Sequence, residues 1–273
     1  MPMSELTGNP GSTRWYGDFQ IAEGFTRLWT VGPMRLRVHH GHNEWRLLRE
    51  QDPDPWLERF ELDYSDDPTL IPDGDKLQRV VLGTPDSKVQ VELRTADRPV
   101  VSRPVSPLSI PGKESARVYV STPVWVRVTL GEQHHLMLEQ PSYRLSDTWF
   151  GPNNMEGEIC YATRSRFRLA LSEQVRSPSR IITPVQIRNQ ADDPLVLDRL
   201  NVPMPWLPLY GDGEGHLWTP EVGLIRREDG DLAELRFKDQ PPRECGGATR
   251  LSPARHTGRQ HTVFRAFTDL LRG

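Results

Sequence analysis

The chain has 273 residues, enough for one large or two moderate domains whose cores need no disulfide. Its 34 Lys+Arg and 37 Asp+Glu residues give a formal net charge of -3, which excludes the basic surface of a general nucleic-acid binder, so no nucleic-acid partner is expected. The two cysteines, Cys160 and Cys245, form no CxxC pair, which argues against a zinc ribbon or redox dithiol and is typical of a reducing compartment.

The chain carries no recognisable export or membrane signal. Its first residues contain no basic region that leads into an apolar run. A run of about 18 apolar residues, the length that a spanning helix needs, occurs nowhere. We therefore expect a cytoplasmic protein with no membrane span.

Alternating apolar residues predict β-strands along most of the chain. The 25 prolines leave little room for long helices, because each removes a backbone donor. A period of two places one set of side chains on one face of a strand, as in Met34, Leu36 and Val38, in Val89, Val91 and Leu93, in Val124, Val126 and Val128, and in Phe167, Leu169 and Leu171. Further strands are expected at 117–120, 135–138, 181–188, 195–200 and 232–237. The predicted fold class is all-β, with two antiparallel β-sandwich-like domains.

The turn-rich stretch near residue 145 divides this strand pattern into two domains. We expect an N-terminal β domain over 1–145 and a C-terminal domain over 146–240. The second contains VQIRNQADDPLVLDRLNV, two strands around a polar turn, a pattern similar to that of immunoglobulin-like sandwiches. Residues 241–273 are expected to form a flexible linker and a short C-terminal amphipathic helix.

That helix is predicted from a change of period near the C-terminus. Its apolar face would consist of Val263, Phe264, Phe267, Leu270 and Leu271. About a dozen residues are marginal as an isolated helix, so this face needs a surface to pack on. Either a protein partner provides that surface, or the helix folds back on its own domain.

Several segments together resemble a known family. They include RWYGDFQIAEG, RPVSPLSIPG followed by YVSTPVWV, and FGPNNMEGEICYATRSR. Their order and spacing over residues 14–240 resemble an uncharacterised prokaryotic family, domain-of-unknown-function family 432. The resemblance implies no catalytic residue. It implies an accessory role beside small-conductance mechanosensitive channels, with the channel's cytosolic region as a possible protein partner.

Two segments carry candidate site residues. His39, His40 and His42, with Glu44, are potential metal ligands in the HHGHN turn, although a solvated hairpin turn accounts for them as well. The second segment combines aromatic, amide and arginine side chains that can hold a sugar, an anion or a peptide: Trp149, Phe150, Asn153, Asn154, Tyr161, Arg164 and Arg166. The alternative is that the aromatic rings pack internally while the arginines reach water.

No catalytic motif accompanies these residues. The sequence has no GxSxG, P-loop or dinucleotide glycine motif, so an enzyme is disfavoured and no cofactor is expected. The leading hypothesis is a non-catalytic interaction or regulatory module. The alternative is a carbohydrate- or small-ligand-binding protein, or a metal-dependent hydrolase built on a β scaffold.

Overall fold

The computed structural model describes residues 14–82, 86–151, 153, 155–174, 176–227, 232–237, 239–257 and 261–268. Strands dominate, and within these ranges the only helical segments are the short 3-10 turns η1 (Pro68–Leu70), η2 (Leu171–Glu173) and η3 (Met204–Trp206). The all-β class is therefore confirmed. The chain divides into two compact units, which are described separately: unit 1 comprises the described residues up to Leu93 with Trp125–Tyr143, and unit 2 comprises Arg94–Val124 with the described residues from Arg144 onward.

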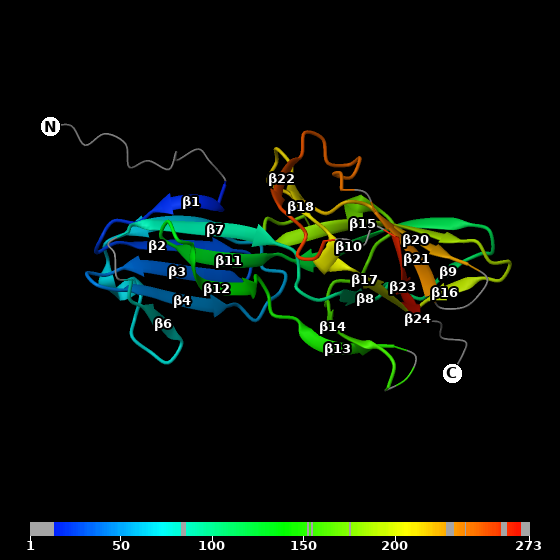
Figure 1. Ribbon diagram of the computed structural model, residues 1–273, viewed down its shortest axis with the longest axis horizontal. Helices are drawn as coiled ribbons and strands as arrows, with labels where there is room; N and C mark the ends of the chain where they lie inside the picture. The colour runs from blue at the N-terminus through cyan, green and yellow to red at the C-terminus, as the bar shows by residue number, and fades with distance from the viewer. Residues whose placement is uncertain are drawn as a thin grey trace. The chain divides into compact units, whose positions relative to one another are not determined.

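Unit 1 is built from two sheets (Figure 1). The first has the order β1 (Gly17–Gln20), β7 (Lys88–Arg94), β11 (Trp125–Leu130) and β12 (His135–Pro141). The second has the order β5 (Phe60–Ser65), β2 (Thr26–Val31), β3 (Met34–His40), β4 (Trp45–Gln51) and β6 (Leu77–Val80). Strands β2 and β3 form one antiparallel hairpin, and β3 and β4 form the next.

The alternation in the sequence sets the core of unit 1. On β3, Met34, Leu36 and Val38 are buried, while the intervening arginines stay partly exposed. Strand β7 repeats this pattern. The Phe19 ring of β1 meets the Trp29 ring of β2 edge to face, with the ring centroids 5.3 Å apart, so an aromatic contact joins the two sheets.

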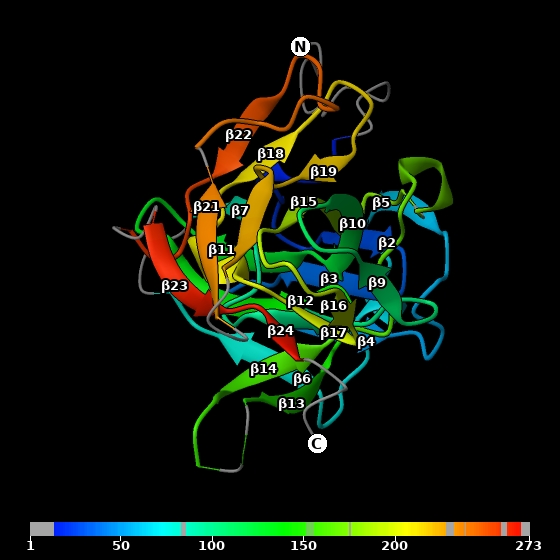
Figure 2. The same ribbon diagram turned by 90° about the vertical axis from the view of Figure 1, so that its right-hand side faces the viewer.

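Unit 2 contains the remaining sheets (Figure 2). The largest has the order β22 (Thr249–Ser252), β18 (Leu209–Gly211), β19 (Leu217–Trp218), β15 (Arg180–Asn189), β20 (Val222–Arg226), β21 (Leu232–Phe237) and β23 (His261–Arg265), with β10 (Ser115–Pro123) also paired to β15. A five-stranded sheet has the order β13 (Ser146–Phe150), β14 (Glu158–Ala162), β8 (Val100–Ser102), β17 (Arg199–Val202) and β24 (Phe267–Thr268). Strands β16 (Leu195–Leu197) and β9 (Leu108–Ile110) form a separate pair.

Strand β15 is the centre of unit 2, and its neighbours make the sheet mixed. On one edge it pairs antiparallel with β10 from Arg180 to Arg188. On the other edge it pairs parallel with β19 and then with β20. The purely antiparallel arrangement expected from the sequence is therefore wrong for unit 2. Parallel neighbours require a long crossover, and the stretch from Gln190 to Glu221 between β15 and β20 supplies one.

The predicted C-terminal amphipathic helix is also wrong. Val263 and Phe264 lie in β23, which pairs with β21, and Phe267 lies in β24, which pairs with β17. Leu270 and Leu271 lie outside the described residues. The physical reason is that β21 and β17 present unpaired backbone groups, and a segment with β-branched and aromatic residues satisfies them better than an isolated short helix could. Ala266, between the two strands, is fully buried.

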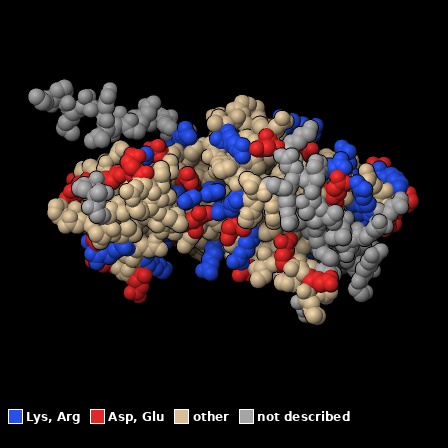
Figure 3. All heavy atoms as spheres, viewed as in Figure 1, with Lys and Arg blue, Asp and Glu red and all other residues tan. Residues whose placement is uncertain are grey.

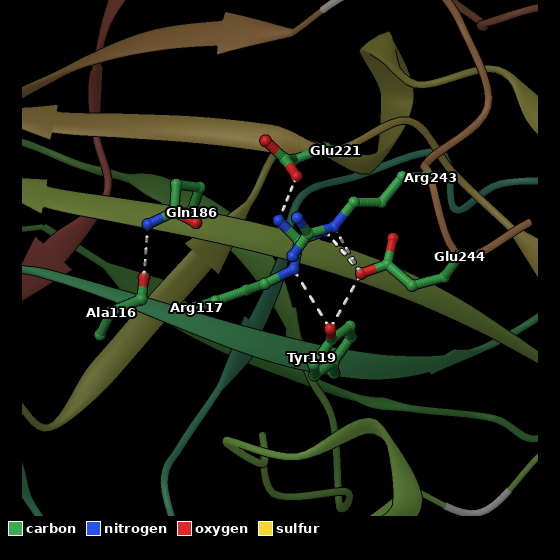
Figure 4. A network of polar contacts seen from close by, with 7 residues as sticks. All are labelled: Ala116, Arg117, Tyr119, Gln186, Glu221, Arg243 and Glu244. Carbon is green, nitrogen blue, oxygen red and sulfur yellow. Dashed lines mark hydrogen bonds and ion pairs between the residues drawn. The ribbon is translucent and has the colours of Figure 1, made fainter.

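The segment before β22 is fixed to the large sheet by a polar network (Figure 4). The Glu244 carboxylate accepts hydrogen bonds from Arg117 at 2.7 Å and from the Tyr119 hydroxyl at 2.9 Å. Arg117 also pairs with Glu221. The next residue, Cys245, is buried against Tyr119 and the rings of Tyr210 and Trp218. Residues 244 and 245 thus pack on unit 2 although the surrounding Pro-Gly-rich sequence has the composition of a linker.

A chain ending at Thr257, which lacks β23 and β24, is expected to be less stable. Two sheet edges would lose their outer strand, and a loss of several kcal/mol corresponds to a decrease in Tm of about 10 °C for a chain of this size. Thermal denaturation followed by circular dichroism measures this. A chain ending at Thr268 keeps both strands and is the control. Equal Tm values for the two truncated chains would contradict the strand pairing.

Glu244→Gln is expected to make stability less dependent on pH. Burial by itself raises the pKa of Glu244, but the hydrogen bonds and the positive charge of Arg117 outweigh it, so the pKa lies below the ordinary value of 4.5. The carboxylate therefore stabilises the fold above about pH 4.5, and this contribution disappears as the pH falls through the lowered pKa.

Urea unfolding at pH 7 should show Glu244→Gln to be about 1–3 kcal/mol less stable than wild type, and the difference should shrink toward pH 3. Glu61→Gln, at an exposed pair with Arg59, is the matched control and should change little. A Glu244→Gln penalty of the same size at both pH values would show that the charge is not responsible.

Candidate binding sites

The hairpin formed by β13 and β14 holds a tryptophan ring in a fixed, exposed position. The Trp149 indole Nε1 donates a hydrogen bond to the Asn153 carbonyl, 2.7 Å away. A Cβ atom at Gly157 would lie only 2.8 Å from Trp149 Cε2, so this glycine leaves room for the ring. The side chain is nevertheless 39% exposed. Local structure therefore orients the ring while one part of it stays open to solvent.

The turn that connects the two strands is organised by Asn153. Its side-chain Oδ1 accepts hydrogen bonds from the backbone N–H groups of Met155 and Glu156, both at 2.8 Å. Such a side-chain acceptor replaces backbone partners in a tight turn. Gly151 and Gly157 approach so closely that a Cβ on Gly151 would lie 2.7 Å from the Gly157 Cα. The sequence GPNNMEG therefore contains both the glycines and the amide that this turn requires.

The outer face of the hairpin has an apolar end and a polar end. Trp149 is the cross-strand partner of Ile159, which is 56% exposed, and Met155 at the turn is 92% exposed. Two residues along the strands, Asp147 opposes Tyr161 on the same face.

Arg98 connects the two members of this polar pair. It contacts Asp147 at 3.3 Å and lies over the Tyr161 ring, 5.3 Å from its centroid. The Tyr161 hydroxyl donates to Asp97 at 3.1 Å. Apolar and charged groups thus lie next to one another on one sheet face.

The other residues predicted for this site do not all share that face. Phe150 points to the opposite side of β13, where it is buried with Val101 and Cys160. Arg166 donates to the Pro104 carbonyl at 2.9 Å, and Arg164 is exposed. Asn154 lies outside the described residues. Trp149, Asn153 and Tyr161 therefore belong to one hairpin surface, whereas Phe150 supports it from behind.

Ile159, the apolar partner of Trp149 on this face, and Met155 in the turn were not predicted from the sequence. A signal was present, because period-two alternation across the hairpin sets Ile159 opposite Trp149 once the turn is placed at 151–157.

The thiol behind the hairpin is shielded. Cys160 is fully buried, and burial, followed by the charge of Glu158, raises its pKa to about 12. Burial also raises the pKa of Cys245 to about 12. Neither sulfur is a thiolate near neutral pH, so neither cysteine has the properties of a nucleophile.

The three histidines of the HHGHN turn bind different neighbours. The Nδ1 atoms of His39, His40 and His42 lie 3.0 Å from Thr26 Oγ1, 2.8 Å from the Ile21 carbonyl and 2.6 Å from Glu23 Oε1, respectively. His40 also stacks on Trp45, with ring centroids 4.1 Å apart. In the part of the chain that the structure describes, no three His, Cys, Asp or Glu side chains are grouped so as to hold a metal ion.

The surface of the described residues carries side chains of both charge signs (Figure 3). On the face shown in Figure 3, basic and acidic side chains of the described residues are interspersed. None of the helical segments in the described ranges has the length and apolar character to cross a membrane.

Asn153→Ala is expected to loosen the turn, whereas Asn153→Asp, which keeps the acceptor oxygen, should not. Loss of two hydrogen bonds, each worth about 1 kcal/mol, should speed exchange of the Met155 and Glu156 amide hydrogens about tenfold or more. Hydrogen exchange measured by NMR tests this. Equal exchange rates in the two variants would show that the side chain does not organise the turn.

A comparison with models of protein families gives a match over nearly the whole chain. A model of the family described as protein of unknown function (DUF432) matches residues 15–272, which includes the C-terminal strands beyond the region where the resemblance was seen in the sequence. No match is found among curated proteins or among solved structures. With nearly its whole length matched, the chain belongs to the DUF432 family of proteins of unknown function.

Proposed function

We propose that the protein is a non-catalytic interaction module of the cytoplasm that binds a protein partner on the outer face of the β13–β14 hairpin. The observation that carries the proposal is the Trp149 ring, exposed and yet held by Asn153 and Gly157 beside the exposed Ile159. Tryptophan is among the residues that most often dominate binding energy at protein interfaces. A ring already fixed in place loses little conformational freedom when a partner binds.

The neighbouring side chains favour a protein over a carbohydrate. Exposed Ile159 lies opposite Trp149 and extends its apolar area. Met155 is exposed in the adjoining turn, and methionine is enriched at protein interfaces. A sugar would require free hydrogen-bonding groups around the ring. The cross-strand partner of Trp149 is aliphatic, and Asp147 and Tyr161 on the same face already bond to Arg98 and Asp97. The Arg98, Asp147 and Tyr161 group supplies a polar rim on the same face.

The outer edge of β13 adds a second means of attachment. This strand is the last in its sheet, and among the described residues only β14 pairs with it. An extended segment of a partner could continue the sheet there through backbone hydrogen bonds, with its side chains beside Trp149. The partner that we propose is the cytosolic region of a small-conductance mechanosensitive channel, as the family resemblance implies.

Binding of the full-length protein to the purified channel and to its cytosolic region should be measured by biolayer interferometry. Ile159→Ser is expected to weaken binding at least tenfold, because the serine removes apolar contact without touching the core. Leu136→Ser on β12 is the matched control, since Leu136 and Ile159 are both 56% exposed. Its affinity should stay at the wild-type value.

Two other outcomes decide different parts of the proposal. If both serine variants weaken binding equally, or if neither weakens it, the hairpin is not the docking surface. If the channel does not bind but a purified protein recovered from solubilised membranes does, and Ile159→Ser weakens that protein alone, the docking surface stands and the channel is the wrong partner.

A further inference from the structure

Unit 1 contains a pocket beside the turn that connects β3 and β4 of its five-stranded sheet. Its volume is about 620 Å³, and its lining includes His39, Glu44, Arg46 and Arg79, with Val81 as an apolar member. That volume lies within the range of small-molecule sites. Because the pocket belongs to unit 1 and the hairpin surface to unit 2, it raises a question of function separate from protein docking.

Three basic side chains form a row across this pocket. His39 on β3 is the register partner of Arg46 on β4, and Arg46 is the register partner of Arg79 on β6. Register partners on adjacent strands project from the same face with their Cβ atoms about 5 Å apart. Arg46 and Arg79 carry like charges directly opposite one another, which is unfavourable unless an anion lies between them.

One carboxylate provides part of that compensation. Glu44 Oε1 accepts from Arg46 Nε at 2.6 Å, and Glu44 Oε2 accepts from Arg79 Nε at 2.7 Å. These hydrogen bonds, that from Arg46 first, lower the pKa of Glu44, so it is charged at neutral pH. A single negative charge thus faces two guanidinium groups, each of which has five N–H donors in total.

The other carboxylates near the row approach its guanidinium groups less closely than Glu44 does. Glu23 lies on the exposed rim, where it is paired with His42 at 2.6 Å. Asp73 approaches Arg46 only at 3.9 Å and is itself 85% exposed. Burial, and next the charge of Arg46, lowers the pKa of His39.

We propose that this pocket binds a small organic anion through carboxylate or phosphate oxygens that contact Arg46 and Arg79, with His39 beside them. Guanidinium groups suit planar or tetrahedral oxyanions because their N–H donors form a rigid fork. Glu44 holds both guanidinium groups in place and competes with the ligand for their N–H donors. The pocket is larger than a bare oxyanion, and Val81, 73% exposed, offers a contact for the carbon skeleton.

The test uses the full-length protein with sulfate, inorganic phosphate and citrate, and with chloride at matched ionic strength. Calorimetry should show at least one oxyanion binding at one site with a dissociation constant at or below about 10 mM, and chloride should not reproduce it. Arg79→Gln should weaken this binding about tenfold or more. Arg79 is 59% exposed, so its replacement leaves the core intact. Arg59→Gln, at an exposed pair on the β5 edge, is the matched control and should bind like wild type.

Glu44→Gln separates binding from a purely structural role. If Glu44 competes with the ligand, its neutral replacement should bind the oxyanion severalfold more tightly, even if the variant is less stable. The proposal is overturned if none of the three oxyanions binds, if Arg79→Gln binds like wild type, or if a folded Glu44→Gln variant binds no more tightly. Should Glu44→Gln not fold, the comparison of Arg79→Gln with Arg59→Gln decides.

Discussion

The need to pair the backbone groups at sheet edges determines much of this structure. An unpaired edge offers a row of N–H and C=O groups to any other strand, so β proteins cover or guard their edges. In unit 2 the C-terminal segment does this twice, since β23 covers the edge of β21 and β24 covers the edge of β17. Ala266 is buried between these strands, where a larger side chain would have to displace its neighbours. Among the described residues β13, like β22, β23 and β24, is an outermost strand of its sheet, and β13 carries the exposed Trp149.

Two carboxylate and arginine networks show how the same chemistry can serve different purposes. Glu244 is enclosed, and its partners Arg117 and Tyr119 belong to one strand of the large sheet, so the network fixes a Pro-Gly-rich segment against unit 2. Glu44 joins two arginines on neighbouring strands, but these side chains line a pocket that solvent reaches. Closure makes the first network a structural anchor. In the second network Arg46 and Arg79 are 31% and 59% exposed, against 16% for Arg117, so their N–H donors are open to the ligand that we propose.

Period-two alternation allowed the strands and the all-β class to be predicted, because burial of one face is a local property of residues such as Met34, Leu36 and Val38. It could not reveal that β15 has parallel neighbours, since pairing between distant segments leaves no local trace. The C-terminal error has a similar origin. Val263, Phe264 and Phe267 fit a helical face, and the competing strand is favoured only when the edges of β21 and β17 are known. For the sites, Trp149 and His39 could be identified by residue type, whereas Ile159, Arg46 and Arg79 required the register.

The turn between β13 and β14 shows how a polar, glycine-rich sequence can support the docking surface that we propose. Exposure alone would let Trp149 contribute little to the free energy of binding, because a freely rotating ring loses its conformational freedom when a partner binds. The Asn153 carbonyl fixes the indole N–H, and the Asn153 side chain fixes the carbonyl by ordering the turn. Gly157 admits the ring against the backbone. If this surface binds the partner that we propose, the residues that set its affinity include some that the partner never touches, because they hold the Trp149 ring in place.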